Sequence, residues 1–197
     1  MTAQALPLFA DAGTDAGGTD ALRDALIAFW REAGPQKWFA KDPAFDVVFR
    51  DRFATAYSRA VRGALNRWAD SPEGALALVL LLDQYPRNAF RGTPWMYATD
   101  PIARLVSEQA LGRGLWERVA DDVRLFLLLP LGHSEDPADQ ERSVTLADAC
   151  VPASAARARH HRDIVLRFGR FPHRNAILGR TSTAEERAYL EAGGYAG

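Results

Sequence analysis

The chain has 197 residues, of which 48% are hydrophobic and 25% charged, and its formal net charge is −1. This length and composition suit one globular domain of ordinary size. The balanced charge gives no overall field that would attract nucleic acid or an anionic membrane, so we expect neither as a partner. The single cysteine, Cys150, cannot form a disulfide within the chain, as is typical of a reducing compartment.

The first residues, 1–19, mix Ala, Gly, Thr and Asp, and their short apolar run at 5–10 lacks the basic lead of a signal peptide. We therefore expect a flexible leader over 1–19, a single all-helical domain over 20–197 and a cytoplasmic location. The longest strongly apolar stretch, residues 75–82, is far shorter than the roughly 20 residues that span a bilayer. The sequence thus predicts no membrane segment.

Helix starts recur along the chain as Asp or Ser followed by Pro, which is a cap with a first-turn proline. They are Asp42-Pro43, Ser71-Pro72, Asp100-Pro101 and Asp136-Pro137. A further start is expected at Ser182, with Glu185 completing a capping box. Helix stops are expected at glycines such as Gly34 and Gly169.

Between these signals the apolar residues follow helical spacing, and no stretch alternates for long enough to predict a sheet. Residues 75–82 and 125–131 are apolar nearly all round, which is typical of central, enclosed elements. The fold class is therefore all-α, with about eight helices. Besides two amphipathic helices near the start of the chain, helices are expected at 100–112, 116–130, 137–149, 154–168 and 183–192.

Three polar segments interrupt the apolar pattern, two of them directly after an apolar run. We call residues 83–94 the first polar segment, 133–136 the second and 167–182 the third. The third contains four arginines and one histidine without any carboxylate. Planar guanidinium groups held on rigid turns suit a carboxylate or phosphate ligand.

The charges of the carboxy-terminal region also allow a purely structural interpretation. Residues 157–180 hold seven Arg and one Asp, whereas residues 117–148 hold eight acids and three Arg. Ion pairs between the two stretches could hold helix ends together as a structural ionic lock, without any ligand. This alternative stays open beside a binding site.

Candidate ligand-binding residues come from all three polar segments: Asp83, Arg87, Asn88, Arg91, His133, Glu135, Arg167, Arg170, His173, Arg174, Asn175 and Arg180. The candidates for catalysis are His133, Glu135 and His173, because each could carry a proton near neutral pH. A hydrolase-type enzyme would use His133 and Glu135 as proton carriers and Arg170 and Arg174 as electrostatic stabilisers. No two histidines show the tight spacing of a metal site, so we expect neither a metal nor another cofactor.

The same segments resemble the characteristic motifs of a bacterial family catalogued as domain of unknown function 924. The matching residues are Asp83–Asn88 with Phe90-Arg91-Gly92, His133–Asp136, and Arg167–Asn175 with Leu178-Gly179-Arg180. The resemblance implies a tetratricopeptide-like, right-handed α–α superhelix in a single domain, and it implies no established activity. The bulky residues Trp95, Met96 and Tyr97 stand where the family usually has smaller ones.

Superhelical folds of paired helices often present a concave recognition surface. We therefore expect the three polar segments to form one rigid Arg, His and carboxylate site. Its expected ligand is an anionic small molecule or a peptide carboxylate. The sequence leaves the oligomeric state open.

Overall fold

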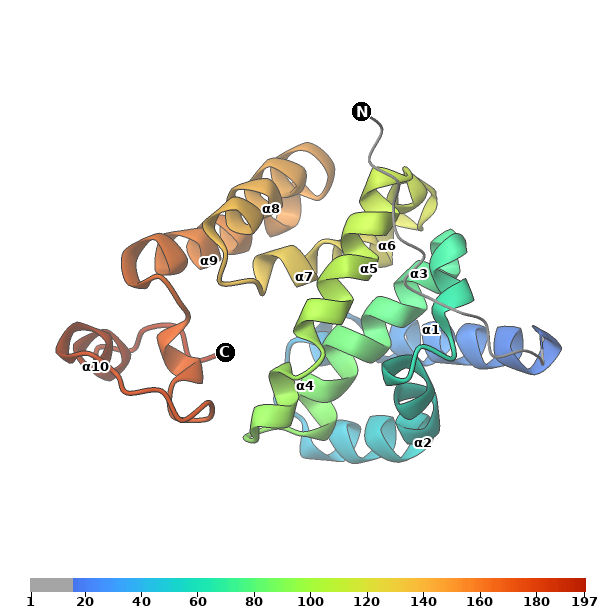
Figure 1. Cartoon of the computed structure of the whole chain (residues 1–197), viewed down its shortest axis with the longest axis horizontal. Coiled ribbons are helices and arrows are strands. Elements are labelled where there is room, and N and C mark those ends of the chain that lie inside the picture. The colour runs from blue at the N-terminus through green and yellow to red at the C-terminus, as the bar shows by residue number, and fades with distance from the viewer. Residues whose placement is uncertain (1–15) are drawn as a thin grey trace.

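Every regular element in residues 16–197, the part of the chain that the computed structural model describes, is helical. Figure 1 shows the amino-terminal helices packed around α3 on one side, α8 to α10 on the other side, and α7 between them. The expected all-helical, single-domain fold is confirmed, and the superhelical arrangement stays a prediction. The α-helices are α1 Ala16–Trp38, α2 Pro43–Val61, α3 Pro72–Val79, α4 Tyr85–Ala89, α5 Asp100–Gly112, α6 Asp121–Arg124, α7 Leu129–Gly132, α8 Pro137–Cys150, α9 Ala155–Phe168 and α10 Ala184–Glu191.

Helix α1 begins at Ala16, before the boundary expected at residue 20. Residues 1–15, which make up most of the predicted leader, lie outside the described residues. The expected stop at Gly34 is present as a kink, where this residue takes φ 70°. None of the described helices combines the length and the apolar character needed to cross a membrane.

Three of the four expected Asp or Ser caps are present: Asp42, Ser71 and Asp136 each accept from backbone N–H groups of the first turn. Asp100 does not cap α5, because its carboxylate instead binds the guanidinium of Arg87 at 2.7 and 2.9 Å. A tertiary ion pair has replaced the local cap at this helix start.

The centre of the core is the predicted apolar run at residues 75–82, in which every side chain is at most 2% exposed. Aromatic rings of α1 and α2 cover one side of it, with Trp30 and Phe49 at a centroid distance of 5.3 Å. The second predicted run, 125–131, brings Phe126 edge-on to Trp30. Both apolar runs are thus central elements, as expected.

The single helix expected at 116–130 is wrong. The chain there forms a 3₁₀ segment, Leu115–Arg118, then α6, a second 3₁₀ segment, Leu125–Leu127, and α7. The backbone is extended at Val119, and Pro130 has no N–H to continue a helical hydrogen-bond ladder. These breaks turn α7 toward the carboxy-terminal helices.

A π-helical segment, η2 (Leu80–Gln84), separates α3 from α4 inside the core. Pro86 cannot donate a hydrogen bond to the carbonyl of Leu82, and its ring crowds that carbonyl. The hydroxyl of Thr99 donates to this carbonyl instead, at 2.6 Å. The π turn therefore places Asp83 and Gln84 directly after the apolar run, and the Leu82 carbonyl stays hydrogen-bonded. Single π turns inside α-helices are frequent at functional sites.

Replacing Thr99 by Val is expected to destabilise the fold by about 1–3 kcal/mol, because the buried carbonyl of Leu82 loses its donor. Urea unfolding of both proteins measures this difference. Thr145→Val is the matched control, since the hydroxyl of Thr145 bonds within α8 at an exposed position. An equal loss of unfolding free energy in the two variants would contradict the role assigned to Thr99.

Candidate functional site

The three polar segments meet in space, between the amino-terminal helices and the carboxy-terminal group. The Asp83 carboxylate lies 2.8 Å from Nδ1 of His133, and Arg174 donates to the His133 carbonyl at 2.9 Å. Arg180 binds Glu135 with both terminal nitrogens, at 2.6 and 3.0 Å. The first segment thus contacts the second, and the second contacts the third.

Asp83 is the most enclosed charged group of this junction, with no exposed surface. Besides His133, it accepts from Nε2 of Gln84 at 2.5 Å and lies 3.1 Å from Nη1 of Arg87. Burial opposes ionisation of this carboxyl, but Arg87 and His133 outweigh it and lower its pKa. Burial, together with Arg87, lowers the pKa of His133. At neutral pH the pair is therefore an aspartate and a neutral imidazole.

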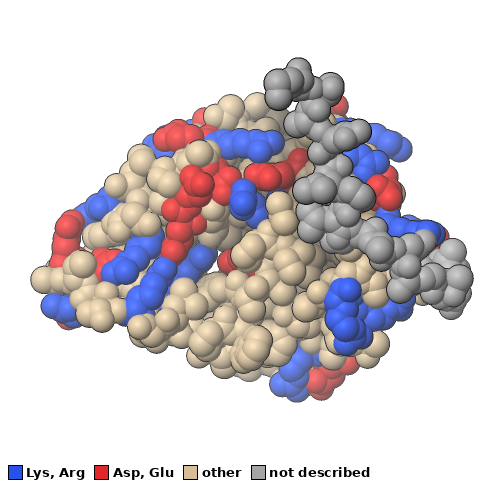
Figure 2. Space-filling view, in the orientation of Figure 1, with Lys and Arg blue, Asp and Glu red and all other residues tan. Residues whose placement is uncertain are grey.

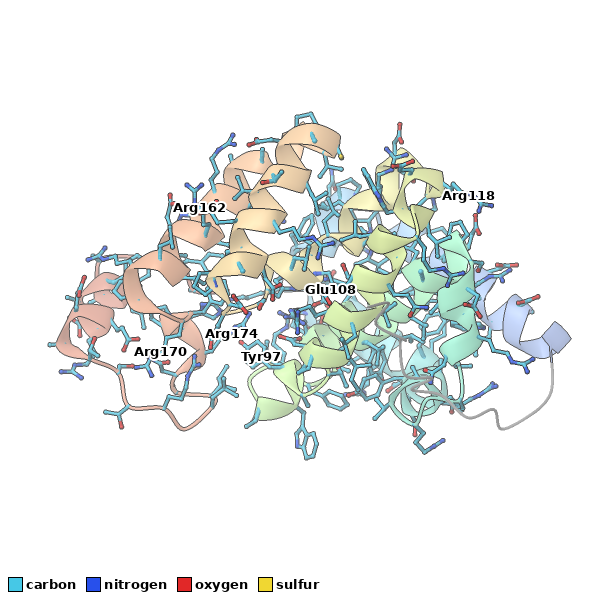
Figure 3. The ribbon with its side chains drawn as sticks, turned by 45° about the horizontal axis from the view of Figure 1, so that its top comes forward. Tyr97, Glu108, Arg118, Arg162, Arg170 and Arg174 are labelled. Carbon is cyan, nitrogen blue, oxygen red and sulfur yellow. The ribbon has the colours of Figure 1, made fainter. Side chains whose placement is uncertain are left out.

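Tyr97 lies close to Arg174 (Figure 3). Its ring centroid is 4.6 Å from Arg174 and 5.8 Å from Arg87. Arg174 is 8% exposed, its Nε has no hydrogen-bond partner in the described residues, and its nearest recorded carboxylate is Asp100 at 3.8 Å. Burial lowers the pKa of Arg174. This arginine is thus a buried cation with incomplete pairing.

A cavity of about 280 Å³ opens beside these groups. Among the described residues its lining includes three histidines, His133, His161 and His173, together with the last residue, Gly197, and no Asp or Glu side chain. Burial is the main cause that lowers the pKa of both His161 and His173 to about 3. The cationic side chains of the lining are Lys41, Arg87, Arg91, Arg157 and Arg174.

Arg157 and Lys41 are the cations of this lining that have no ion pair among the described residues. The Arg157 guanidinium lies 4.0 Å from the ring centroid of Phe39. By contrast, Arg91 pairs with Asp46 at 2.8 Å. Arg157 thus has no carboxylate of the described residues within ion-pair distance.

The aromatic side chains of the lining come from distant parts of the chain: Trp38, Phe39, Tyr97, Phe171 and Tyr195. Tyr195 packs against both buried histidines, with centroid distances of 4.9 Å to His161 and 5.0 Å to His173. The cavity thus combines cationic donors with flat apolar walls.

Six of the sequence-based candidates line the cavity, namely Arg87, Asn88, Arg91, His133, His173 and Arg174. Asp83 lies behind this lining, where it holds His133 and Arg87. The other five candidates form pairs elsewhere: Glu135, Arg167, Arg170, Asn175 and Arg180.

Glu135, the second proton carrier of the enzyme hypothesis, does not line the cavity. Its carboxylate binds Arg180 and accepts from the backbone N–H of Phe171 at 2.8 Å. Burial opposes ionisation of Glu135, yet Arg180 and the Phe171 N–H outweigh it and lower its pKa. The carboxylate that orients His133 is Asp83.

A second ion-pair group lies around Glu186, which is 2% exposed. Arg170 binds both of its oxygens at 2.6 and 2.8 Å, and Asn175 donates to it at 3.2 Å. The capping box of α10 is formed by Thr183 and Glu186, so the box expected at Ser182 and Glu185 falls one residue later. Arg170 and Asn175 select this register because they hold the carboxylate of Glu186.

Acidic and basic side chains alternate on the surface of the carboxy-terminal helices (Figure 2). One exposed pair there joins Arg167 and Glu185 at 2.9 Å. The structural ionic lock considered from the sequence therefore describes the pairs of Arg180 with Glu135 and of Arg159 with Asp148. Arg170 pairs instead with Glu186, outside the acidic stretch 117–148, whereas Arg87 and Arg174 line the cavity.

Sequence reasoning did not select Lys41, Arg157 or Tyr195 for the site. Arg157 stands four residues before His161 on α9, a spacing that places both on one helix face, so this signal could have been used. No comparable pattern marks Tyr195. Of the three bulky residues at 95–97, Met96 and Tyr97 line the cavity, whereas Trp95 is 66% exposed and does not.

Among the described residues, no three His, Cys, Asp or Glu side chains are arranged to hold a metal ion. The Nδ1–H of His161 donates to the Gly132 carbonyl at 3.1 Å. Its Nε2 is buried and has no partner in the described residues.

A family model described as bacterial protein of unknown function, DUF924, matches residues 26–194. The chain belongs to this family. A solved structure of a protein of unknown function from Agrobacterium tumefaciens is 52% identical to it, with a TM-score of 0.86, and the match covers 88% of this chain and 99% of that one. No curated protein matches the chain. Family membership thus supports the fold but names no activity. A function has to be inferred from the geometry of the site.

The pKa of Glu186 is lowered from 4.5 to about 2, chiefly by its hydrogen bond with Arg170. Its ionised form thus stabilises the fold above about 4.5, and this contribution is lost as the pH falls toward about 2. We expect Glu186→Gln to lower the unfolding free energy at neutral pH, and the gap to wild type to close over this window. Urea unfolding at a series of pH values measures the gap.

Glu185→Gln is the matched control, because the pair of Glu185 with Arg167 is exposed on both sides. Surface pairs contribute about 0–1 kcal/mol, so this variant should follow the wild-type curve. A Glu186→Gln curve parallel to wild type at all pH values would contradict the assignment.

Proposed function

We propose that the cavity binds a small anionic molecule or the carboxylate of a peptide. The observation that supports the proposal is the lining itself, to which the described part of the chain contributes five cationic side chains and no Asp or Glu side chain. Arg157 and Arg174 carry most of the argument, because Arg157 has no ion pair and Arg174 has only a distant one among the described residues. A bound anion would complete the pairing of these two groups.

The size and walls of the cavity limit the ligand. About 280 Å³ lies near the lower end of small-molecule sites, which measure roughly 300–1,000 Å³. Guanidinium groups favour carboxylate and phosphate because their planar donors match two oxygens. The rings of Phe39 and Tyr97, already in contact with arginines, offer flat surfaces to the apolar part of such a ligand.

Arg157→Gln is expected to weaken anion binding by about tenfold or more, since a hydrogen bond to a charged group contributes about 1.5–3 kcal/mol. The melting temperature should stay unchanged, because Arg157 is exposed and lacks an ion pair among the described residues. Calorimetric titration with sulfate, inorganic phosphate, simple carboxylates and a peptide with a free carboxy terminus measures the effect.

The matched control is Arg159→Gln, two residues along α9, where the guanidinium pairs with Asp148 on the surface. This variant should bind like wild type. If no anion binds, or if both variants bind equally, the proposal fails and the structural lock is the interpretation that stays.

A hydrolase-type enzyme is the second candidate function, and the contact of Asp83 with His133 at 2.8 Å is the observation that favours it. A neutral histidine oriented by a buried carboxylate is suited to accept a proton from water or substrate. In this arrangement Asp83 is the partner of His133. Of the two arginines considered as stabilising cations, Arg174 lines the cavity and Arg170 does not.

For this second candidate, His133→Ala is expected to abolish turnover of anionic esters while sulfate binding stays largely intact. Product formation followed by mass spectrometry, in parallel with calorimetry, measures both quantities. If the wild-type protein turns over none of the esters that it binds, the enzyme hypothesis fails and binding stays the proposed function.

We also propose a cytoplasmic location and a superhelical, tetratricopeptide-like arrangement of the helices, as expected from the sequence. The free thiol of Cys150 supports the location, since free cysteines are common in reducing compartments. Neither nucleic acid nor a membrane is proposed as a partner.

A further inference from the structure

His133 offers the cavity one specific hydrogen-bonding atom. Its Nδ1 faces the carboxylate of Asp83 at 2.8 Å. An ionised carboxylate only accepts hydrogen bonds, so Nδ1 carries the proton. In the neutral ring, Nε2 therefore carries a lone pair and acts as an acceptor.

This Nε2 is free and reachable. It has no hydrogen-bond partner among the described residues, and it is not one of their buried, unpaired nitrogen atoms, which include Nε2 of His161. Since His133 lines the cavity, a ligand there can contact this nitrogen.

Two arginines lie close to His133. Arg87 Nη1 and His133 Nδ1 both contact the same oxygen of Asp83, at 3.1 and 2.8 Å, and Arg87 is also bound by Asp100. Arg174 donates to the backbone carbonyl of His133 at 2.9 Å, and its nearest carboxylate among the described residues is 3.8 Å away. A ligand whose acidic group binds Arg174 thus has its neighbouring atoms close to His133.

We propose that the ligand is a hydroxy acid, whose hydroxyl group, close to the acidic group, donates a hydrogen bond to Nε2 of His133. The inference rests on the proposed anion binding. A plain carboxylate or a sulfate has only acceptor oxygens, which would face the lone pair of Nε2 without a proton between them. A hydroxyl supplies that proton, and sites that bind a substrate hydroxyl discriminate against analogues that lack it.

Three matched pairs of acids test the inference, because each pair replaces the hydroxyl by a methyl group of similar size. They are lactate and isobutyrate, malate and methylsuccinate, and mandelate and 2-phenylpropionate. We expect the hydroxy acid of at least one pair to bind about tenfold more tightly in calorimetric titration, as one hydrogen bond predicts.

The variant His133→Asn removes the ring acceptor and is expected to lose the preference for the hydroxy acid. His160→Asn is the matched control, because His160 is exposed and does not line the cavity, so this variant should keep the preference. The wild-type comparison alone is decisive if His133→Asn fails to fold.

Equal binding within every pair that binds would overturn the inference and leave the proposed function standing. The same holds if sulfate binds and none of the six acids does. Absence of binding by sulfate, phosphate and all six acids would overturn both.

Discussion

The buried carboxylate of Asp83 is the interaction on which the rest of the site depends. A fully buried carboxylate is tolerated only when it is paired and hydrogen-bonded, and Asp83 meets this requirement with Gln84, Arg87 and His133. Each partner lies in or beside a different helical segment. The need to satisfy one charge thus fixes the π segment, α4 and the end of α7 relative to one another.

This arrangement has a chemical consequence at the cavity. Arg87 is held by Asp83 and Asp100, so its planar donors keep a fixed orientation. His133 is held in one tautomer by the same carboxylate. Preorganised groups lose little conformational entropy when a ligand binds. This rigidity is consistent with the proposed binding of a small anion.

The arginines of the third polar segment divide into two roles, although they look alike in the sequence. Arg170 and Arg180 have bidentate carboxylate partners, which neutralise them and hold the carboxy-terminal helices together. Arg174 lies beside Tyr97, and its nearest carboxylate among the described residues is that of Asp100 at 3.8 Å. The distance to the nearest acid, not the residue type, separates Arg170 and Arg180 from Arg174.

The sequence by itself determined the all-helical class, the two buried apolar runs and most helix starts, because apolar periodicity and Asp-Pro or Ser-Pro caps act through neighbouring residues. It also placed the polar residues at helix ends. Only the tertiary structure decided which charges meet. Asp100 binds Arg87 instead of capping α5, Glu186 takes the place of Glu185 in the capping box, and Asp83 contacts His133 from 50 residues away. Ion pairing depends on distances between segments far apart in the chain, and local spacing carries no information about those distances.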